Sequence, residues 1–341
     1  MQQKNQLLSQ AFQVCAIVLA VSTFALLVYT GRFVLMMGLI GIGLATLVSP
    51  MLRFLHEKFK IPRVLSVVTF LIVVALVLAL GFWGIGNVVI DQLEDLTLKA
   101  PELMNKLEER WSALYERYPI IQDQISTLNI SATLKAGGSQ IVKGAQSGAT
   151  LVSGLAFAFV IAMYASISAQ SYLKRFVGLF PASKRERVTS IMGRLALTLR
   201  KWFRAQLTDM AIIGGLTMFG LWLVGAKYWA VFGLLTAILG LIPYLGILIM
   251  VVVAGLVTFA SDPLMVPWVL GVFVITQQIE GNIVLPLVMK DQIDIPEMPL
   301  LIFMLLMATW FGLIGVFLST PVFALFKVLH AELIRPKLES S

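Results

Sequence analysis

The chain has 341 residues, of which 59% are hydrophobic and only 13% are charged. Soluble domains carry about 25% charged and about 45–50% apolar residues, so this composition excludes an ordinary soluble protein. The net charge of +8 matches the excess of Lys and Arg in the cytoplasmic loops of membrane proteins, so it indicates no nucleic-acid partner.

Apolar runs of about 20 residues, the length that crosses a bilayer as a helix, predict an all-α integral membrane protein. The first run is too long for the apolar region of a signal peptide, so we expect it to be a retained helix. In chain order the predicted apolar runs are 11–30, 33–52, 64–90, 148–168, 207–224, 228–259, 264–289 and 298–327.

Three small residues, Gly41, Ala45 and Ser49, recur every four positions on the second predicted helix. Small residues at this spacing let another helix approach closely. We favour packing within one subunit over a contact between subunits.

Residues 91–147 differ from the apolar runs because they hold eight acidic and six basic residues. Apolar side chains recur there every three or four positions, from Leu93 to Ile121, which is typical of amphipathic helices in water or at an interface. We predict a small extramembrane helical insert on the periplasmic side. The predicted regions are therefore 1–90, 91–147, 148–206 and 207–341.

The segment 170–204 holds nine basic residues and one acidic residue, Glu186. Such a cluster marks the cytoplasmic side of a membrane protein and also attracts anionic lipids; we favour its role as a topology signal. Both chain termini and 53–63 are then expected to be cytoplasmic, whereas 91–147 and 290–299 are expected outside.

Two of the later apolar runs are interrupted by helix breakers, Pro243 and Gly246 in one and Gly281 and Pro286 in the other. Proline removes a helical hydrogen bond and glycine permits a reversal. Both runs are either kinked spans, which gives eight transmembrane helices, or re-entrant hairpins, which gives six. We favour two re-entrant hairpins.

Polar residues lie inside the second interrupted run, at a depth where such groups usually mark a path for a solute or ion. They are Gln277, Gln278, Glu280 and Asn282. Residue chemistry leaves two interpretations open for Glu280: a proton-carrying or solute-contacting carboxylate, or a cap at the end of a hairpin.

Other titratable residues have simpler interpretations. Asp209 is interpreted as an interfacial charge pair or a helix-terminus effect, and Asp262 as a turn residue. The single cysteine, Cys15, excludes a disulfide within the chain. His56 and His330 lie beside charged residues outside the predicted spans, which favours solvated side chains over metal ligands. We expect no metal ion and no cofactor.

Three stretches together resemble the autoinducer-2 exporter family of bacterial inner-membrane proteins. They are GLLTAILGLIPYLG at 233–246, QQIEGNIVLPLVMKDQIDIP at 277–296 and GLIGVFLSTPVFALFKV at 312–328. Two positions depart from the family pattern: Ile247 follows Gly246 where members often have proline, and Lys290 stands where glycine is usual. These departures bear on substrate identity more than on fold.

The resemblance implies export of a small polar solute such as autoinducer-2 across the inner membrane, coupled to protons or sodium ions. It also implies a homo-oligomer such as a pentamer, with an elevator-like movement of the half that holds the hairpins. Some relatives look like sodium/proton antiporters, so a cation/proton antiporter is an alternative. A channel or a non-transporting scaffold is another.

On the carrier interpretation, Glu280 binds the proton or solute, while Gln277, Gln278 and Asn282 donate and accept neutral hydrogen bonds. Tyr244 is expected to close the site from the opposing tip. The breakers Pro243, Gly246, Gly281 and Pro286 are expected to shape the two hairpins. An enzyme is not expected, because the chain contains no Gly-Lys, His-Glu-x-x-His or Gly-x-Ser-x-Gly motif.

Overall fold

The computed structural model describes residues 16–19, 21–23, 26–60, 62–117, 130–242, 245–289 and 295–333. Every regular element in these residues is a helix, which confirms the all-α class. The long helices are α2 (Arg32–Phe59), α3 (Arg63–Gly81), α4 (Asn87–Arg117), α6 (Ile130–Gly178), α7 (Ala182–Leu223), α8 (Trp229–Leu239), α9 (Leu245–Ser261), α10 (Val266–Ile279) and α12 (Glu297–Leu333).

Five helical segments of the described chain are long and apolar enough to cross a membrane. Each exceeds the length of about 20 residues that a bilayer requires. They are Arg32–Phe59, Ala156–Gly178, Ala182–Leu223, Pro263–Val288 and Glu297–Leu333. The chain is therefore a multi-pass membrane protein.

The small residues of α2 pack against α6, as predicted. A Cβ at Gly41 would lie 2.6 Å from the carbonyl oxygen of Ala158, so the two backbones approach as closely as glycine allows. Ala158 is fully buried beside Met37 and Ile40. Gly41 of the stripe thus serves packing within one chain.

The first interrupted run folds as a helical hairpin of α8 and α9. A Cβ at Gly246 would overlap the carbonyl oxygen of Leu239, so only glycine lets the two helices meet so closely at the tip. With 11 residues, α8 extends about 16 Å at 1.5 Å per residue. That is too short for a bilayer crossing and agrees with a re-entrant hairpin.

The second interrupted run is not a hairpin, which corrects the prediction for 264–289. Helix α10 continues through the π-helical turn η3 (Glu280–Val284) into α11 (Leu285–Met289). A π-turn inserts one extra residue per turn and relaxes the hydrogen-bond ladder. Pro286, which donates no N–H, therefore follows this turn without ending the helix.

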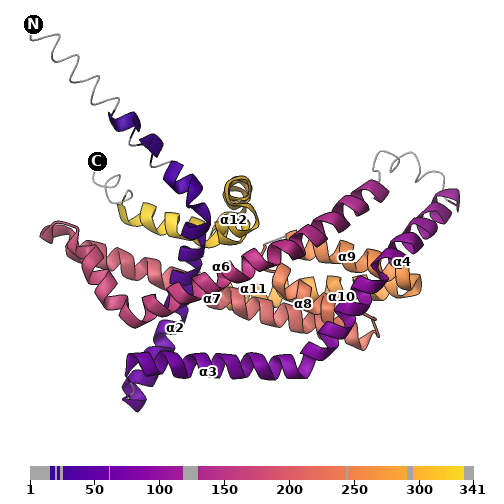
Figure 1. Ribbon diagram of the computed structural model, residues 1–341, viewed down its shortest axis with the longest axis horizontal. Coiled ribbons are helices and arrows are strands. Elements are labelled where there is room, and N and C mark those ends of the chain that lie inside the picture. The colour runs from indigo at the N-terminus through magenta and orange to yellow at the C-terminus, as the bar shows by residue number, and fades with distance from the viewer. Residues whose placement is uncertain are drawn as a thin grey trace, which may run out of the picture.

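The second reversal lies instead within α12, at Gly312. Its φ of 62° and ψ of −148° belong to a region that is essentially restricted to glycine. The rings of Phe303 and Phe323 lie 5.6 Å apart between centroids, whereas a straight helix would separate residues 20 positions apart by about 30 Å. Figure 1 shows the two segments of α12 running in different directions.

The two reversals meet inside the protein. Ile242, next to the tip of the α8–α9 hairpin, packs with Met304 and Val316 on the two segments of α12. The last turn of α12 returns to the basic half of α7, where the carboxylate of Glu332 pairs with Arg194.

This return corrects the predicted position of 295–299, the part of 290–299 that the structure describes. The rings of Phe303 and Phe326 lie 6.0 Å apart between centroids, so the beginning and end of α12 lie at the same end of the molecule. That end is the one of the basic segment 170–204, and not that of the insert. The reason is that only one of the two interrupted runs reverses.

Helix α4 holds the first part of the predicted extramembrane insert and packs across the open end of the α8–α9 hairpin (Figure 1). Its Leu103 and Leu107 are buried against Ala260 of α9, which accounts for the amphipathic pattern of 91–117. The predicted third helix does not end at 90, because α3 continues through the π-helical turn η1 (Phe82–Gly86) into α4.

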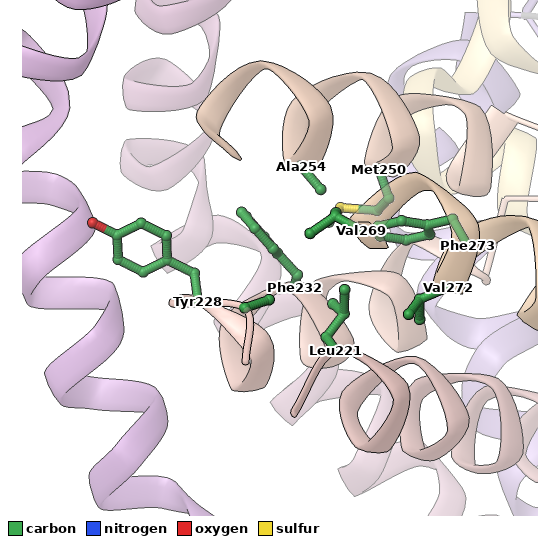
Figure 2. Packing of buried hydrophobic residues seen from close by; sticks show 9 residues of the cluster. Leu221, Tyr228, Phe232, Met250, Ala254, Val269, Val272 and Phe273 are labelled. Atoms are coloured by element: carbon green, nitrogen blue, oxygen red, sulfur yellow. The ribbon is translucent and has the colours of Figure 1, made fainter. Parts of the chain in front are cut away.

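Behind α4, aromatic and aliphatic side chains from α7, α8, α9 and α10 form a buried cluster (Figure 2). Phe232 and Phe273 are 1% exposed. Figure 2 shows the hydroxyl group of Tyr228 pointing out of this cluster, and it donates to a carboxylate oxygen of Asp95 on α4 at 3.0 Å. The insert is thus fixed to the hairpin by polar as well as apolar contacts.

Candidate functional site

Several buried or half-buried polar groups lie near the tip of the α8–α9 hairpin. A cavity of about 40 Å³ lies there between α7, the hairpin and the π-helical turn η3. Its polar wall is formed by Asp209 of α7, Thr236 and Gly240 of the hairpin, and Glu280 of η3. These four residues come from three separate parts of the sequence.

Asp209 is the most buried carboxylate of this wall, with a relative exposure of 6%. Its Oδ1 atom has no hydrogen-bond partner, and a buried unpaired carboxylate oxygen is costly to maintain. Asp209 lies well inside α7, so its interpretation as an interfacial or helix-terminus residue is wrong. Helix α7 begins at Ala182 and not at the predicted 207.

Two further polar residues of the site were missed by sequence reasoning. Gln206, one turn before Asp209, donates from Nε2 to the carbonyl oxygen of Gly240 at 3.1 Å. Thr236 is 2% exposed and donates to the Phe232 carbonyl oxygen at 2.7 Å. The spacing of Gln206, Asp209 and Ile213 on one apolar helix face could have revealed the first of these.

Helix α10 and the turn η3 present Glu280 to this cavity. Glu280 is half-buried, and Gln277 lies one turn earlier on the same side of the helix, where its side chain is near the carboxylate. The Oε1 atom of Gln277 is buried without a hydrogen-bond partner. π-turns are frequent at functional sites because they redirect individual side chains.

The other two polar residues of the predicted group lie on a different face. Gln278 and Asn282 are exposed, and Nδ2 of Asn282 donates to both the carbonyl oxygen and Oε1 of Gln278 at 2.9 Å. The structure thus brings Gln277 and Glu280 together with Asp209, and it separates Gln278 and Asn282 from them.

The predicted hairpin-shaping residues are also divided. Gly246 lies at the tip of the α8–α9 hairpin and is buried. Gly281 and Pro286 are exposed within the continuous helix of α10, η3 and α11. Pro243 and Tyr244 lie outside the described residues, so the expected closure by Tyr244 stays a prediction.

The cavity suits a proton, a water molecule or a single cation. Its volume of about 40 Å³ is enough for at least one water molecule. No group of three or more His, Cys, Asp or Glu side chains that could hold a metal ion occurs in the described part of the chain. The cavity has two carboxylates in its wall, those of Asp209 and Glu280.

The chain was compared with known proteins. The model of the family described as AI-2E family transporter matches residues 15–335. "Putative transport protein YueF" of Bacillus subtilis (strain 168) is 24% identical over 84% of this chain and 80% of its own length. "Putative transport protein YrrI" of the same organism is 26% identical over 88% of this chain and 87% of its own length.

Proposed function

Because this chain belongs to the AI-2E family of transporters, we propose that it is a secondary carrier that exports a small polar solute across the bacterial inner membrane. The coupling ion is a proton that Asp209 and Glu280 share. The observation that carries this proposal is that two carboxylates from different helices face one buried cavity.

The pairing favours coupling because two carboxylates in a poorly hydrated cavity repel each other unless a positive charge lies between them. The unpartnered Oδ1 atom of Asp209 offers a place for that charge. The neutral amide group of Gln277 lies near Glu280, so it offers the carboxylate a polar neighbour without cancelling its charge.

Movement of the hairpin tip relative to α7 is the step that can transfer this charge. Gln206 connects α7 to the carbonyl oxygen of Gly240, beside the two carboxylates. When the tip moves away from α7, this hydrogen bond breaks and the cavity enlarges. We propose that the solute enters at that stage.

A cation/proton antiporter is the second candidate. The same two carboxylates would hold Na⁺ in place of the proton, and oxygen ligands are the kind that hard cations prefer. The cavity has room for a bare cation as well as for a proton.

Orientation and assembly belong to the proposal as well. The basic half of α7 and the end of α12 lie together through Arg194 and Glu332, which supports a cytoplasmic position for both because Lys and Arg gather on that side. The family resemblance supports a homo-oligomer such as a pentamer.

The test is export of autoinducer-2 from cells that lack their own exporters, with and without a proton uncoupler. Wild type, Glu280→Gln and Asp209→Asn are compared at matched membrane abundance, with Asn282→Ala as the control on the outward face. We expect both carboxylate variants to lose at least tenfold in export, whereas Asn282→Ala retains it and the uncoupler abolishes it.

Two outcomes would redirect the proposal. If wild type exports no autoinducer-2 but everted vesicles release protons when Na⁺ is added, the antiporter is the correct function. If both carboxylate variants export as well as wild type, the cavity has a structural role and the carrier site lies elsewhere.

A further inference from the structure

A second hollow, unrelated to the carboxylate cavity, lies where α6 ends and α7 begins. It has a volume of about 540 Å³. Lys174 and Arg185 line it with Thr189, and Leu173 and Val177 form an apolar wall. The hollow therefore combines cations, a hydroxyl group and apolar surface.

The guanidinium group of Arg185 is held in place by the end of α6. Its Nε donates to the carbonyl oxygen of Phe180 at 3.0 Å, and its Nη2 donates to that of Gly178 at 3.4 Å. Helix ends leave carbonyl groups without intrahelical partners, so these bonds orient the side chain. Further N–H groups of the guanidinium fork remain to meet an anion.

The charge of this hollow is not balanced. Lys174 and Arg185 are its two charged lining residues, and both are cations. Within the part of the chain that the structure describes, no carboxylate forms an ion pair with either of them. An anion is therefore the complementary ligand.

The position of the hollow selects among anions. Lys174 lies in the last turns of Ala156–Gly178, a helical segment long and apolar enough to cross a membrane. Leu173 and Val177 lie one turn apart on the same segment and are half-buried. The helix kinks at Ser168, so Lys174 follows the kink, and a bilayer crossed by this segment would have its lipid headgroups near the hollow.

We propose that this hollow binds an anionic phospholipid. The phosphate lies between the ammonium group of Lys174 and the guanidinium group of Arg185, since Arg pairs with phosphate through two parallel hydrogen bonds. The first part of an acyl chain lies along Leu173 and Val177. The site is independent of the transported solute and ties the connection between α6 and α7 to the membrane surface.

The test uses the purified full-length chain in detergent micelles, with phosphatidylglycerol or phosphatidylcholine added at equal mole fraction. The readout is the rise in Tm with phosphatidylglycerol minus the rise with phosphatidylcholine. We expect a positive difference for wild type, a loss of at least half for Lys174→Gln, and a complete loss for Lys174→Glu. Arg175→Gln and Arg175→Glu are the matched controls, because Arg175 is exposed on the same turn and does not line the hollow.

A conservative second variant distinguishes the loss of lipid binding from misfolding. Arg185→Lys keeps the charge but cannot hold a phosphate through two bonds from one planar group, so it is expected to lose part of the preference. Three results would overturn the proposal. They are equal effects of the two lipids on wild type, equal losses in the Arg175 and Lys174 variants, and a full Tm rise with glycerol 3-phosphate alone.

Discussion

The Nε atom of Arg200 on α7 donates to the carbonyl oxygen of Thr46 on α2 at 2.6 Å. That carbonyl group is available because the residue four positions later is Pro50, which lies inside α2 and has no N–H to donate. An arginine from one helix thus completes the hydrogen bonding that a proline leaves open in another. The contact joins α2 and α7, each of which packs against several other helices.

This relationship predicts a specific coupling between Arg200 and Pro50. Arg200→Met should cost about 1–3 kcal/mol, since it leaves a partly buried carbonyl group without a partner. Pro50→Ala restores an N–H, so the same arginine change should cost at least about 0.5 kcal/mol less in that background. Unfolding in mixed micelles, measured over the four variants, checks this. Strictly additive costs would mean that Arg200 acts through something other than the Thr46 carbonyl group.

The glycines at the two reversals, Gly246 and Gly312, should not tolerate substitution by alanine, whereas Gly281 in the π-turn should tolerate it. Gly246→Ala places a methyl group on the carbonyl oxygen of Leu239, and Gly312→Ala forces alanine into a glycine backbone conformation. Each should lower the stability by about 2 kcal/mol or more. A Cβ at Gly281 meets nothing within 4 Å, so Gly281→Ala should be neutral or stabilising by up to about 1 kcal/mol.

The glycine series also tests the corrected position of the second reversal. Denaturation midpoints of the three variants, compared at matched expression, give the result. If Gly281→Ala lowers the stability severely and Gly312→Ala is tolerated, the second reversal lies within 264–289, as the sequence predicted.

The ionic clamp between α4 and the hairpin, formed by Asp95 with Lys227 and Lys99, predicts that the stability of the fold depends on pH. The carboxylate of Asp95 accepts hydrogen bonds from the ammonium groups of Lys227 at 2.8 Å and Lys99 at 2.5 Å. These contacts, that of Lys227 first, hold the pKa of Asp95 well below its ordinary value of 3.8. The same pair holds the pKa of Lys227 above its ordinary value of 10.5.

Asp95 therefore stabilises the fold at pH values above about 4, and this contribution is lost as the pH falls further. The Lys227 contribution is present below about pH 10.5 and is lost as the pH rises beyond it. Between these limits the clamp is expected to be insensitive to pH. Asp95→Asn should have a lower Tm than wild type at pH 7, and the difference should shrink below pH 4. A Tm difference that stays constant over that range would show that Asp95 does not stabilise the fold through its ion pairs.

The α8 helix depends on α4 in a second way. Oε1 of Gln92 accepts from the backbone N–H groups of Ala230 and Val231 at 3.0 and 3.3 Å. These are N-terminal groups of α8 that its own N-cap residue, Tyr228, does not satisfy through its side chain. Gln92→Leu should cost about 1–2 kcal/mol, the value of a lost helix cap. Gln92→Glu, which keeps the acceptor, should restore most of it; hydrogen exchange of the α8 amides reports both.

The two neighbouring glutamines should differ in their effect on transport. Gln277 faces the Glu280 side and Gln278 is exposed beside Asn282. Replacing Gln277 by Leu removes the amide group beside the site carboxylate, and a loss of about fivefold to tenfold in export is expected if this group contributes one hydrogen bond during transport, at about 1–1.5 kcal/mol. Gln278→Leu should leave export within twofold of wild type. Equal losses of export in the two variants would indicate that the transport path runs along the exposed face that holds Gln278 and Asn282.

The sequence by itself determined the membrane class, the helical content and the amphipathic character of α4. Apolar runs of bilayer length and three-to-four-residue periodicity are local properties, because a lipid-exposed backbone must satisfy its hydrogen bonds within one segment. The family followed from three motifs. Gly246 was placed at a reversal correctly, since Pro243 and Gly246 interrupt an otherwise uniform run.

Only the tertiary structure decided which breaker reverses the chain and which carboxylates meet. Gly281 and Pro286 resemble a reversal in sequence, yet a π-turn absorbs them, while Gly312 reverses α12 without a neighbouring proline. Asp209 and Glu280 are separated by more than 70 positions, so their shared cavity depends on how α7 packs against the hairpin and η3. The physical reason is that burial is a property of packed surfaces, and local pattern reports only the periodicity of one helix at a time.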